Sequence, residues 1–201
     1  MAGEKALSTI AILIGLVALL LAADSLVDSI VGRDVLIKTY QMNRLLVFLD
    51  PTADTTGAGY NLMQSLIAVG SGGFFGKGIG NATQSASGFL PEAHTDFIFA
   101  LTSEEFGFVG DMLLLSLFAL LIFSTIRVAY KSDSLFLRLV AVGIVGIWTF
   151  QLLENVGMCI GLMPITGIPL PFISFGSSSM LMQLANVGIV QSVWRHRSQA
   201  R

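Results

Sequence analysis

The chain has 201 residues, of which 54% are hydrophobic and 12% are charged, and its formal net charge is −2. Soluble domains carry about a quarter charged residues, so the composition argues against a water-soluble enzyme, and its low polarity excludes intrinsic disorder. The slight negative charge gives nucleic acid no electrostatic basis for binding, and the single cysteine excludes an internal disulfide framework.

Four apolar segments predict an all-α, polytopic membrane protein. A membrane-spanning helix needs about 20 mostly apolar residues, roughly 17–25. Segments of this kind are residues 7–23, 97–130, 135–163 and 178–194. The first also has features of a signal peptide, since Lys5 precedes it, but its apolar run is longer than a usual signal core. We therefore expect about four transmembrane helices in a single membrane domain, residues 1–201.

The distribution of basic residues predicts the orientation of these spans. Four spans place both termini on one side of the membrane, and loops rich in Lys and Arg face the cytoplasm. Seven of the eleven Lys and Arg residues adjoin span ends on the side of the termini: Lys5, Arg127, Lys131, Arg138, Arg195, Arg197 and Arg201. We therefore expect cytoplasmic termini, a large extracytoplasmic loop at residues 24–96 and a short outer segment at residues 164–177.

The outer loop begins with an expected amphipathic helix and continues with a glycine-rich run. Residues 24–51 alternate charged with apolar positions, which is typical of a helix lying at the membrane interface. Residues 70–80 are rich in glycine, but Ser71 and Gly78 stand where a nucleotide-binding P-loop requires Gly and then Ser or Thr. The run is either a flexible linker or a cradle for pyrophosphate, with Lys77 as a point charge.

The end of the outer loop is densest in reactive groups. Glu92, His94, Thr95 and Asp96 stand close together where the chain enters the membrane. Partial desolvation there strengthens a carboxylate as a general base. Thr95 or Asp96 also suits the N-cap of the helix that follows. The two interpretations are compatible, because a capping residue can also belong to a site.

Polar residues interrupt the second and third apolar segments. Intramembrane carboxylates are costly and usually face a bundle interior or a wet cavity. Gln151 and Asn155 lie on one helix face, and we favour hydrogen bonds between helices for both. For Glu154 the structural and functional interpretations are equally open. The other carboxylates of this kind are Glu104, Glu105 and Asp111.

The outer segment at residues 164–177 is too apolar for an ordinary loop. Its three prolines forbid a regular helix, and non-helical backbone at membrane depth occurs where it is buried in protein or lines a cavity. We expect a re-entrant-like segment whose serines, with Ser174 and Ser178 among them, face an outer cavity. The two histidines, His94 and His196, fall on opposite membrane faces, so a zinc site is not expected.

Together these stretches resemble the SEDS family of bacterial cell-wall proteins, which comprises RodA, FtsW and SpoVE. The sequence of residues 164–172 is more similar to RodA than to FtsW. The matching stretches run in order along the chain: Tyr40-Gln41 with Arg44, residues 48–51, Gly59-Tyr60, residues 72–78, residues 90–99, Glu104-Glu105, residues 155–158 and residues 162–179.

The resemblance implies a ten-helix membrane glycosyltransferase that polymerises lipid II on the outer face of the bacterial cytoplasmic membrane, in cell-wall elongation, cell shape and division. A class B penicillin-binding protein is the implied partner, and Asp96 the implied catalytic general base. A divalent cation, Mg²⁺ or Mn²⁺, is expected to help offset charge on the leaving pyrophosphate. The implied substrate-binding residues are Glu92, His94, Thr95, Lys77, Arg44, Ser174 and Ser178, and the supporting polar residues are Glu104, Glu105, Glu154 and Asn155.

The resemblance covers only the C-terminal half of a family member, because the first six helices of the family are absent. Two further functions therefore stay open. A non-catalytic fragment or scaffold would bind the penicillin-binding protein or a full-length relative. A flippase for the lipid-linked precursor would need polar residues along the whole membrane depth, whereas the carboxylates here gather near the outer surface.

Overall fold

The structure of the protein is a computed structural model that describes residues 44, 46–48, 57–86 and 88–196. The expected span at residues 7–23, most of the expected amphipathic helix at residues 24–51 and the last residues of the chain lie outside this described part. The chain divides into two compact units, Met1–Leu46 and Val47–Arg201. The fold that follows is that of the second unit.

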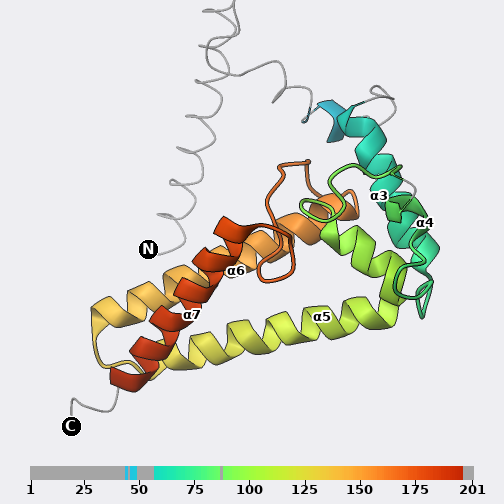
Figure 1. Cartoon of the computed structure of the whole chain (residues 1–201). Coiled ribbons are helices and arrows are strands. Elements are labelled where there is room, and N and C mark those ends of the chain that lie inside the picture. The colour runs from blue at the N-terminus through green and yellow to red at the C-terminus, as the bar shows by residue number, and fades with distance from the viewer. Residues whose placement is uncertain (1–43, 45, 49–56, 87, 197–201) are drawn as a thin grey trace, which may run out of the picture. The chain divides into compact units, whose positions relative to one another are not determined.

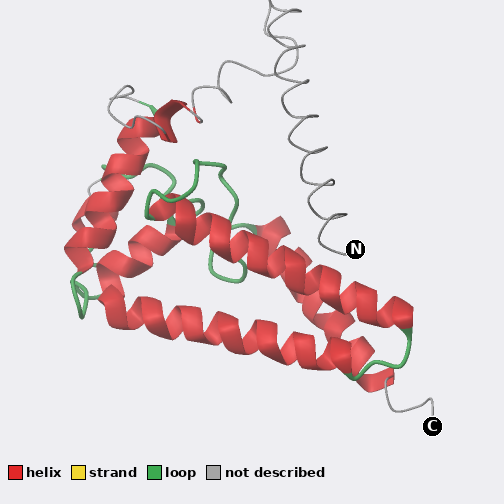
Figure 2. Ribbon diagram, turned by 180° about the vertical axis from the view of Figure 1, so that it is seen from behind, coloured by secondary structure: helices red, strands yellow, loops and turns green. Residues whose placement is uncertain are grey.

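The described residues form helices and loops without a strand (Figure 2), which confirms the all-α prediction. Two of the helices, α5 and α6, are long and apolar enough to cross a membrane. They occupy two of the segments in which spans are predicted. Helix α7 coincides with the predicted span at residues 178–194, but it is not among the described helices that are long and apolar enough to cross a membrane. In chain order the helices are α3 (Ala58–Gly72), α4 (Thr83–Ala86), α5 (Ile98–Tyr130), α6 (Leu135–Cys159) and α7 (Ser177–His196) (Figure 1).

The long helices pack as an antiparallel hairpin, α5 and α6, with α7 against both (Figure 1). Buried and half-buried side chains connect α6 to α7 through hydrogen bonds. Trp148 donates its indole Nε1–H to Gln183 Oε1 at 2.7 Å, and Gln183 Nε2 donates to Gln151 Oε1 at 3.1 Å. This confirms hydrogen bonding between helices for Gln151, since a polar side chain surrounded by apolar groups needs a partner.

Helix α6 ends earlier than the predicted segment, which extends to residue 163. Gly161 has a φ of +72°, in the left-handed region that commonly ends a helix at glycine. Residues 161–176 then form turns and irregular backbone, as the prolines of the segment predict.

Helix α5 bends sharply at Gly107, so that its first nine residues diverge from the long remainder (Figure 1). Gly107 is the residue of α5 with non-helical angles, φ +66° and ψ −167°. A side chain is strongly disfavoured at such a φ. The bend gives the beginning of α5 a direction of its own, toward α3 and the loops of the outer segment.

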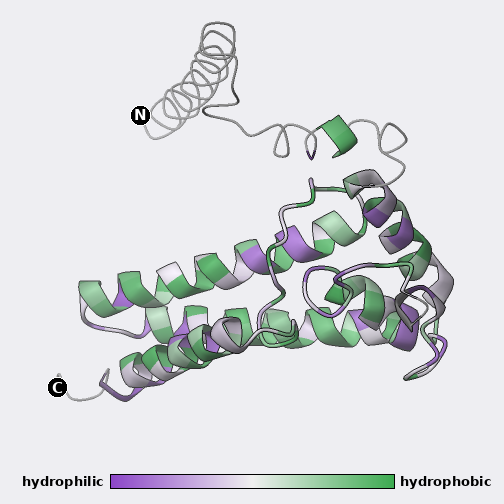
Figure 3. Cartoon of the chain, turned by 45° about the horizontal axis from the view of Figure 1, so that its top comes forward, coloured by the Kyte–Doolittle hydropathy of each residue, from purple (hydrophilic) through white to green (hydrophobic). Residues whose placement is uncertain are grey.

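The core lies at this end of the unit, where α3, the first part of α5 and the last part of α6 meet. Ser65 of α3 donates its hydroxyl to the carbonyl of Cys159 at 2.9 Å. Elsewhere the long helices expose apolar side chains, such as Leu113, 62% exposed, and Phe150, 58% exposed. Figure 3 shows that hydrophobic residues, in green, predominate along these helices. Such a surface suits lipid or further helices. The buried apolar cluster at this end is Val47, Leu62, Ala68, Leu90, Ala93, Phe97, Phe99, Ala100, Met158, Cys159 and Ile165. A second buried cluster comprises Ala82, Ile98, Leu101, Phe118 and Leu170.

Candidate active site

The reactive segment before α5 is a tight turn organised around the carbonyl of Glu92. This oxygen accepts hydrogen bonds from the N–H groups of Thr95, Asp96 and Phe97, at 3.2, 3.1 and 3.2 Å. Glu92 itself has a φ of +55°, which is uncommon for a residue with a side chain and tends to occur where function demands it. The turn therefore holds a fixed and mildly strained backbone.

The turn presents its polar side chains outward. Glu92 and His94 are exposed, and Thr95 and Asp96 are half-buried. The hydroxyl of Thr95 donates to Glu92 Oε2 at 2.9 Å. The N-cap position of α5 is Phe97, without a side-chain cap, so the expected capping by Thr95 or Asp96 is wrong.

Residues that are distant in sequence fix the backbone of this turn. Asn155 of α6 donates from Nδ2 to the carbonyls of Asp96 and Ile168, at 2.8 Å each. Ser174 donates its hydroxyl to the carbonyl of Thr95 at 2.7 Å and accepts the N–H of Leu170 at 2.7 Å. Both side chains are buried. Asn155 therefore joins the turn to the proline-rich segment at residues 164–177. The hydrogen bond between two helices that was expected for Asn155 is not what the structure has.

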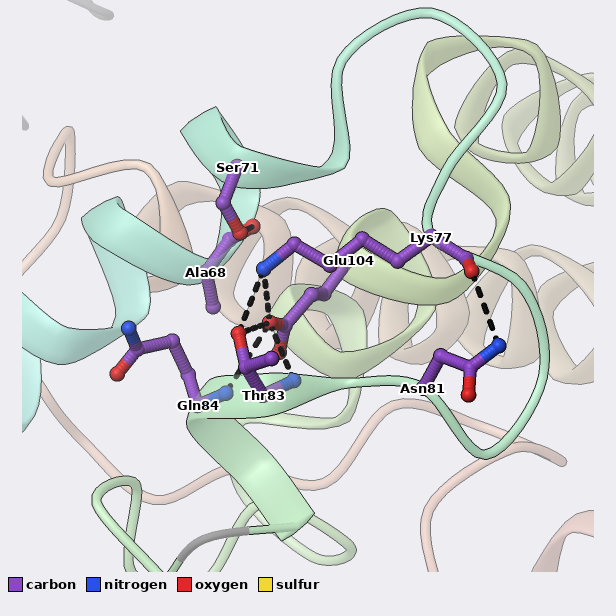
Figure 4. Close-up of polar contacts among 7 residues, drawn as sticks. All are labelled: Ala68, Ser71, Lys77, Asn81, Thr83, Gln84 and Glu104. Carbon is purple, nitrogen blue, oxygen red and sulfur yellow. Dashed lines mark hydrogen bonds and ion pairs between the residues drawn. The ribbon is translucent and has the colours of Figure 1, made fainter.

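A second polar cluster surrounds Glu104, which lies in α5 eight residues after Asp96, or about two helical turns (Figure 4). Glu104 is fully buried, and its Oε1 accepts from Lys77 Nζ at 2.7 Å, from the Thr83 hydroxyl at 2.9 Å and from the N–H groups of Thr83 and Gln84 at 2.8 and 3.1 Å. Lys77 Nζ also donates to the Thr83 hydroxyl at 2.7 Å. The structure therefore unites Lys77 and Glu104, which the sequence singled out separately.

This cluster includes two residues, Thr83 and Gln84, that were not predicted from the sequence. Thr83 and Gln84 begin the short helix α4, and their N–H groups are free to bind a carboxylate because the first N–H groups of a helix have no partner within it. The sequence signal was weak, because a Thr after a glycine-rich run is common. The second oxygen of Glu104, Oε2, has no hydrogen-bond partner within the described residues.

The glycine-rich run is fixed against α5 rather than flexible, so the linker interpretation is wrong. Lys77 and Gly78 donate their N–H groups to the carbonyls of Glu104 and Glu105, at 2.9 and 3.0 Å. A Cβ atom at Gly72 would collide with the carbonyl of Ser103, and one at Gly76 would collide with that of Glu105. Only glycine permits two backbones to approach so closely.

The same hydrogen bonds weaken the idea of a backbone cradle for pyrophosphate. The N–H of Gly76 binds the carbonyl of Gly72 at 2.8 Å, and the N–H of Gly80 binds Glu105 Oε1 at 2.9 Å. Together with Lys77 and Gly78, these groups are already engaged inside the chain. An anion would find the Lys77 ammonium there, 28% exposed and neutralised by Glu104.

The other residues predicted from the sequence, Glu154, Ser178 and Arg44, belong to neither the turn nor the Glu104 cluster. Glu154 is buried and accepts the Thr166 hydroxyl at 2.8 Å, which supports a structural role. Ser178 is exposed on the first turn of α7. Arg44 belongs to the other unit. Within the described part of the chain, no group of three or more His, Cys, Asp or Glu residues is placed to hold a metal ion.

The chain is similar in sequence to known proteins of one family. The sequence model of the FtsW, RodA and SpoVE family, described as "Cell cycle protein", matches residues 1–199. The chain is 45% identical over 162 residues to "Peptidoglycan glycosyltransferase MrdB" of Escherichia coli (strain K12), covering 81% of this chain and 44% of that protein. It is 44% identical to "Stage V sporulation protein E" of Bacillus subtilis over 162 residues, again 81% of this chain and 44% of the relative.

Solved structures agree with these sequence matches. A chain described under "Structural coordination of polymerization and crosslinking by a peptidoglycan synthase complex" aligns with a TM-score of 0.66 at 34% identity, over 93% of this chain and 49% of that one. A mutant of the Thermus thermophilus rod shape determining protein RodA aligns with a TM-score of 0.51 at 41% identity, over 54% of this chain and 36% of that one. The chain spans about half the length of the relatives it matches.

Proposed function

Since the chain belongs to the FtsW, RodA and SpoVE family, we propose that it carries the catalytic outer face of a glycosyltransferase that polymerises lipid II. The observation that carries this proposal is the turn at residues 92–97. There Asp96 remains partly accessible while Asn155 and Ser174 hold the backbone on either side of it. A general base has to be both reachable and precisely held.

The proposed reaction uses the Asp96 carboxylate as the base. The hydroxyl of the acceptor sugar attacks the anomeric carbon of the donor, its proton passes to Asp96, and a new C–O bond forms. The bond from the anomeric carbon to the lipid pyrophosphate breaks, and its electron pair leaves with the pyrophosphate. General base catalysis of this kind contributes about 10²–10⁴-fold to the rate.

The neighbouring groups of the turn suit the recognition of sugar. Glu92, His94 and Thr95 offer an acceptor, an imidazole and a hydroxyl beside Asp96, at an exposed or half-buried surface. Exposed Ser178 and the Lys77 ammonium remain proposed substrate contacts, and Arg44 remains one by family resemblance. Ser174 fits a positioning role better, because both partners of its hydroxyl are backbone groups.

The described residues do not form a ligand set for a resident metal, so no step of this mechanism passes through one. Assistance by Mg²⁺ or Mn²⁺ stays a prediction of the resemblance. Chelation with EDTA followed by addition of each cation tests it directly in the polymerisation assay.

The topology proposed for the chain has four spans, cytoplasmic termini and a re-entrant-like segment at residues 164–177. The length and apolarity of α5 and α6 support it, and so does the position of Arg127 and Lys131 at the end of α5. The proposed location is the bacterial cytoplasmic membrane. The proposed partner is a class B penicillin-binding protein, because a related solved chain belongs to a complex that coordinates polymerisation with crosslinking.

A non-catalytic scaffold is the second candidate, and one observation favours it. The chain covers 44% of the relatives it matches, and an open apolar groove of about 780 Å³ lies between α5 and α6, where further helices could pack. The flippase has less support. Gln151 and Gln183, the polar groups deeper in the helices, bind one another and Trp148 rather than lining a path.

Polymerisation of labelled lipid II by the purified chain tests the proposal, alone and with the penicillin-binding partner. Asp96→Asn and the exposed-surface control Asp133→Asn are assayed beside it. Glycan formation that the first variant alone abolishes supports catalysis by this chain. If no mixture forms glycan although the folded chain binds its partner, catalysis by this chain alone is refuted and the scaffold leads.

A further inference from the structure

The loop that joins α3 to α4 exposes large apolar side chains. Within residues 73–80, called the aromatic loop below, Phe74 is 69%, Phe75 81% and Ile79 76% exposed. In water such a cluster is costly, and contiguous apolar surface of this kind marks an interaction site. The catalytic proposal gives these three side chains no role.

The backbone of the aromatic loop forms hydrogen bonds within the protein, as an apolar environment requires. Its N–H groups at Gly76, Lys77 and Gly78 bind carbonyls of Gly72, Glu104 and Glu105. In return, the carbonyls of Gly73 and Phe74 accept the N–H groups of Phe108 and Val109, at 2.9 and 3.2 Å, which the bend at Gly107 leaves without helical partners. Non-helical backbone near hydrocarbon requires internal satisfaction of this kind.

The length of α5 predicts how deep in the membrane the aromatic loop lies. Twenty residues separate Gly107 from Arg127, which at about 1.5 Å a residue is a rise of about 30 Å. The hydrocarbon core of a bilayer has the same thickness, about 30 Å. With Arg127 at one boundary of the core, Gly107 and the aromatic loop bound to it stand at the opposite boundary.

The aromatic loop is continuous with the apolar surface of the span. The ring of Phe74 lies 5.5 Å from that of Phe108, which is 51% exposed. Val109, Met112 and Leu113 continue the exposed apolar surface along α5. Figure 1 and Figure 2 both show the loop beside the bend of α5, seen from opposite sides.

We propose that Phe74, Phe75 and Ile79 insert into the lipid leaflet at the end of α5 opposite Arg127, among the acyl chains just below the headgroups. The partner is the bilayer itself, and the insertion fixes the height of Lys77 and Glu104 relative to the membrane surface. This inference requires only that α5 spans the membrane and is independent of the proposed chemistry.

Spin-label accessibility tests the insertion. The full chain carrying Phe75→Cys or Ile79→Cys is labelled with a nitroxide and reconstituted in vesicles of phosphatidylethanolamine and phosphatidylglycerol. Cys159 is fully buried and does not compete for the label. Oxygen concentrates in the bilayer, whereas a nickel chelate stays in water. The matched control is Asn81→Cys, an exposed polar position just beyond the loop.

Insertion predicts that the labels at positions 75 and 79 collide several-fold more with oxygen than with the nickel chelate, and that the label at position 81 shows the reverse. Two results overturn the proposal. High nickel accessibility at both positions places the loop in water, and low accessibility to both reagents places it against protein, such as a second chain or further helices.

Discussion

The reactive turn at residues 92–97 and the Lys77–Glu104 cluster use charge in opposite ways. In the cluster, the carboxylate is fully buried and its ion pair and hydrogen bonds hold a loop and a short helix against α5. In the turn, neutral side chains at Asn155 and Ser174 hold the backbone, and the ionisable side chains stay accessible. Glu104 is out of reach of a ligand, whereas the carboxylates of the turn are exposed or half-buried, so the turn is the stronger candidate for catalysis.

The largest expected effect is on activity, from Asp96→Asn. This change keeps the shape of the side chain and removes its basicity, so we expect polymerisation to fall about 10²–10⁴-fold. The bond from Asn155 goes to the Asp96 carbonyl and is kept in the variant, and the melting temperature in detergent is measured beside activity to separate a loss of chemistry from a loss of folding. Retained activity in Asp96→Asn would remove the turn from the catalytic role.

The next largest effect is on stability, from Lys77→Met. This change leaves the Glu104 carboxylate buried without its cation, and removal of one partner from a buried pair costs about 3–5 kcal/mol. Because the Lys77 side chain is 28% exposed, we expect the lower end of that range. Denaturant unfolding followed by circular dichroism measures it.

Adding Glu104→Gln to Lys77→Met should recover part of the loss, since no buried charge is then left unpaired. Lys131→Met, at an exposed lysine, is the control and should be nearly neutral. If Lys77→Met is equally neutral, the cluster does not hold the loop.

A smaller loss is expected from Gly107→Ala. The φ of +66° at this position costs a residue with a side chain about 1–3 kcal/mol, and the new Cβ would collide with the N–H of Gly76. The matched control is Gly146→Ala in α6, which has open space around it and should stabilise by up to about 1 kcal/mol. Unfolding curves measure the stability of both variants. Equal changes in stability for Gly107→Ala and Gly146→Ala would argue against the close packing of Gly107 against Gly76.

Ser174→Ala should have the mildest effect. It removes the partner of the Thr95 carbonyl and of the Leu170 N–H, at a cost of about 1–3 kcal/mol for buried groups left unpaired. Polymerisation should fall, but less than in Asp96→Asn, because the base remains and only its support is loosened. Ser124→Ala, at an exposed serine of α5, serves as the control. A loss in Ser174→Ala equal to that in Asp96→Asn would indicate direct contact with substrate.

The sequence by itself determined the membrane class and the positions of α5, α6 and α7, and it singled out residues 92–96 as the candidate site. Hydrophobic runs and proline act locally, so their consequences can be predicted without the fold. The family resemblance, which the comparisons confirm, rests on the same local stretches.

Only the tertiary structure decided how these stretches meet. No local pattern could show that Lys77 pairs with Glu104 across 27 positions, or that Ser174 holds a carbonyl 79 positions away. The glycine-rich run looked flexible because glycine is permissive by itself. Packed against the bend at Gly107, the same absence of side chains allows close backbone contact and makes the run fixed.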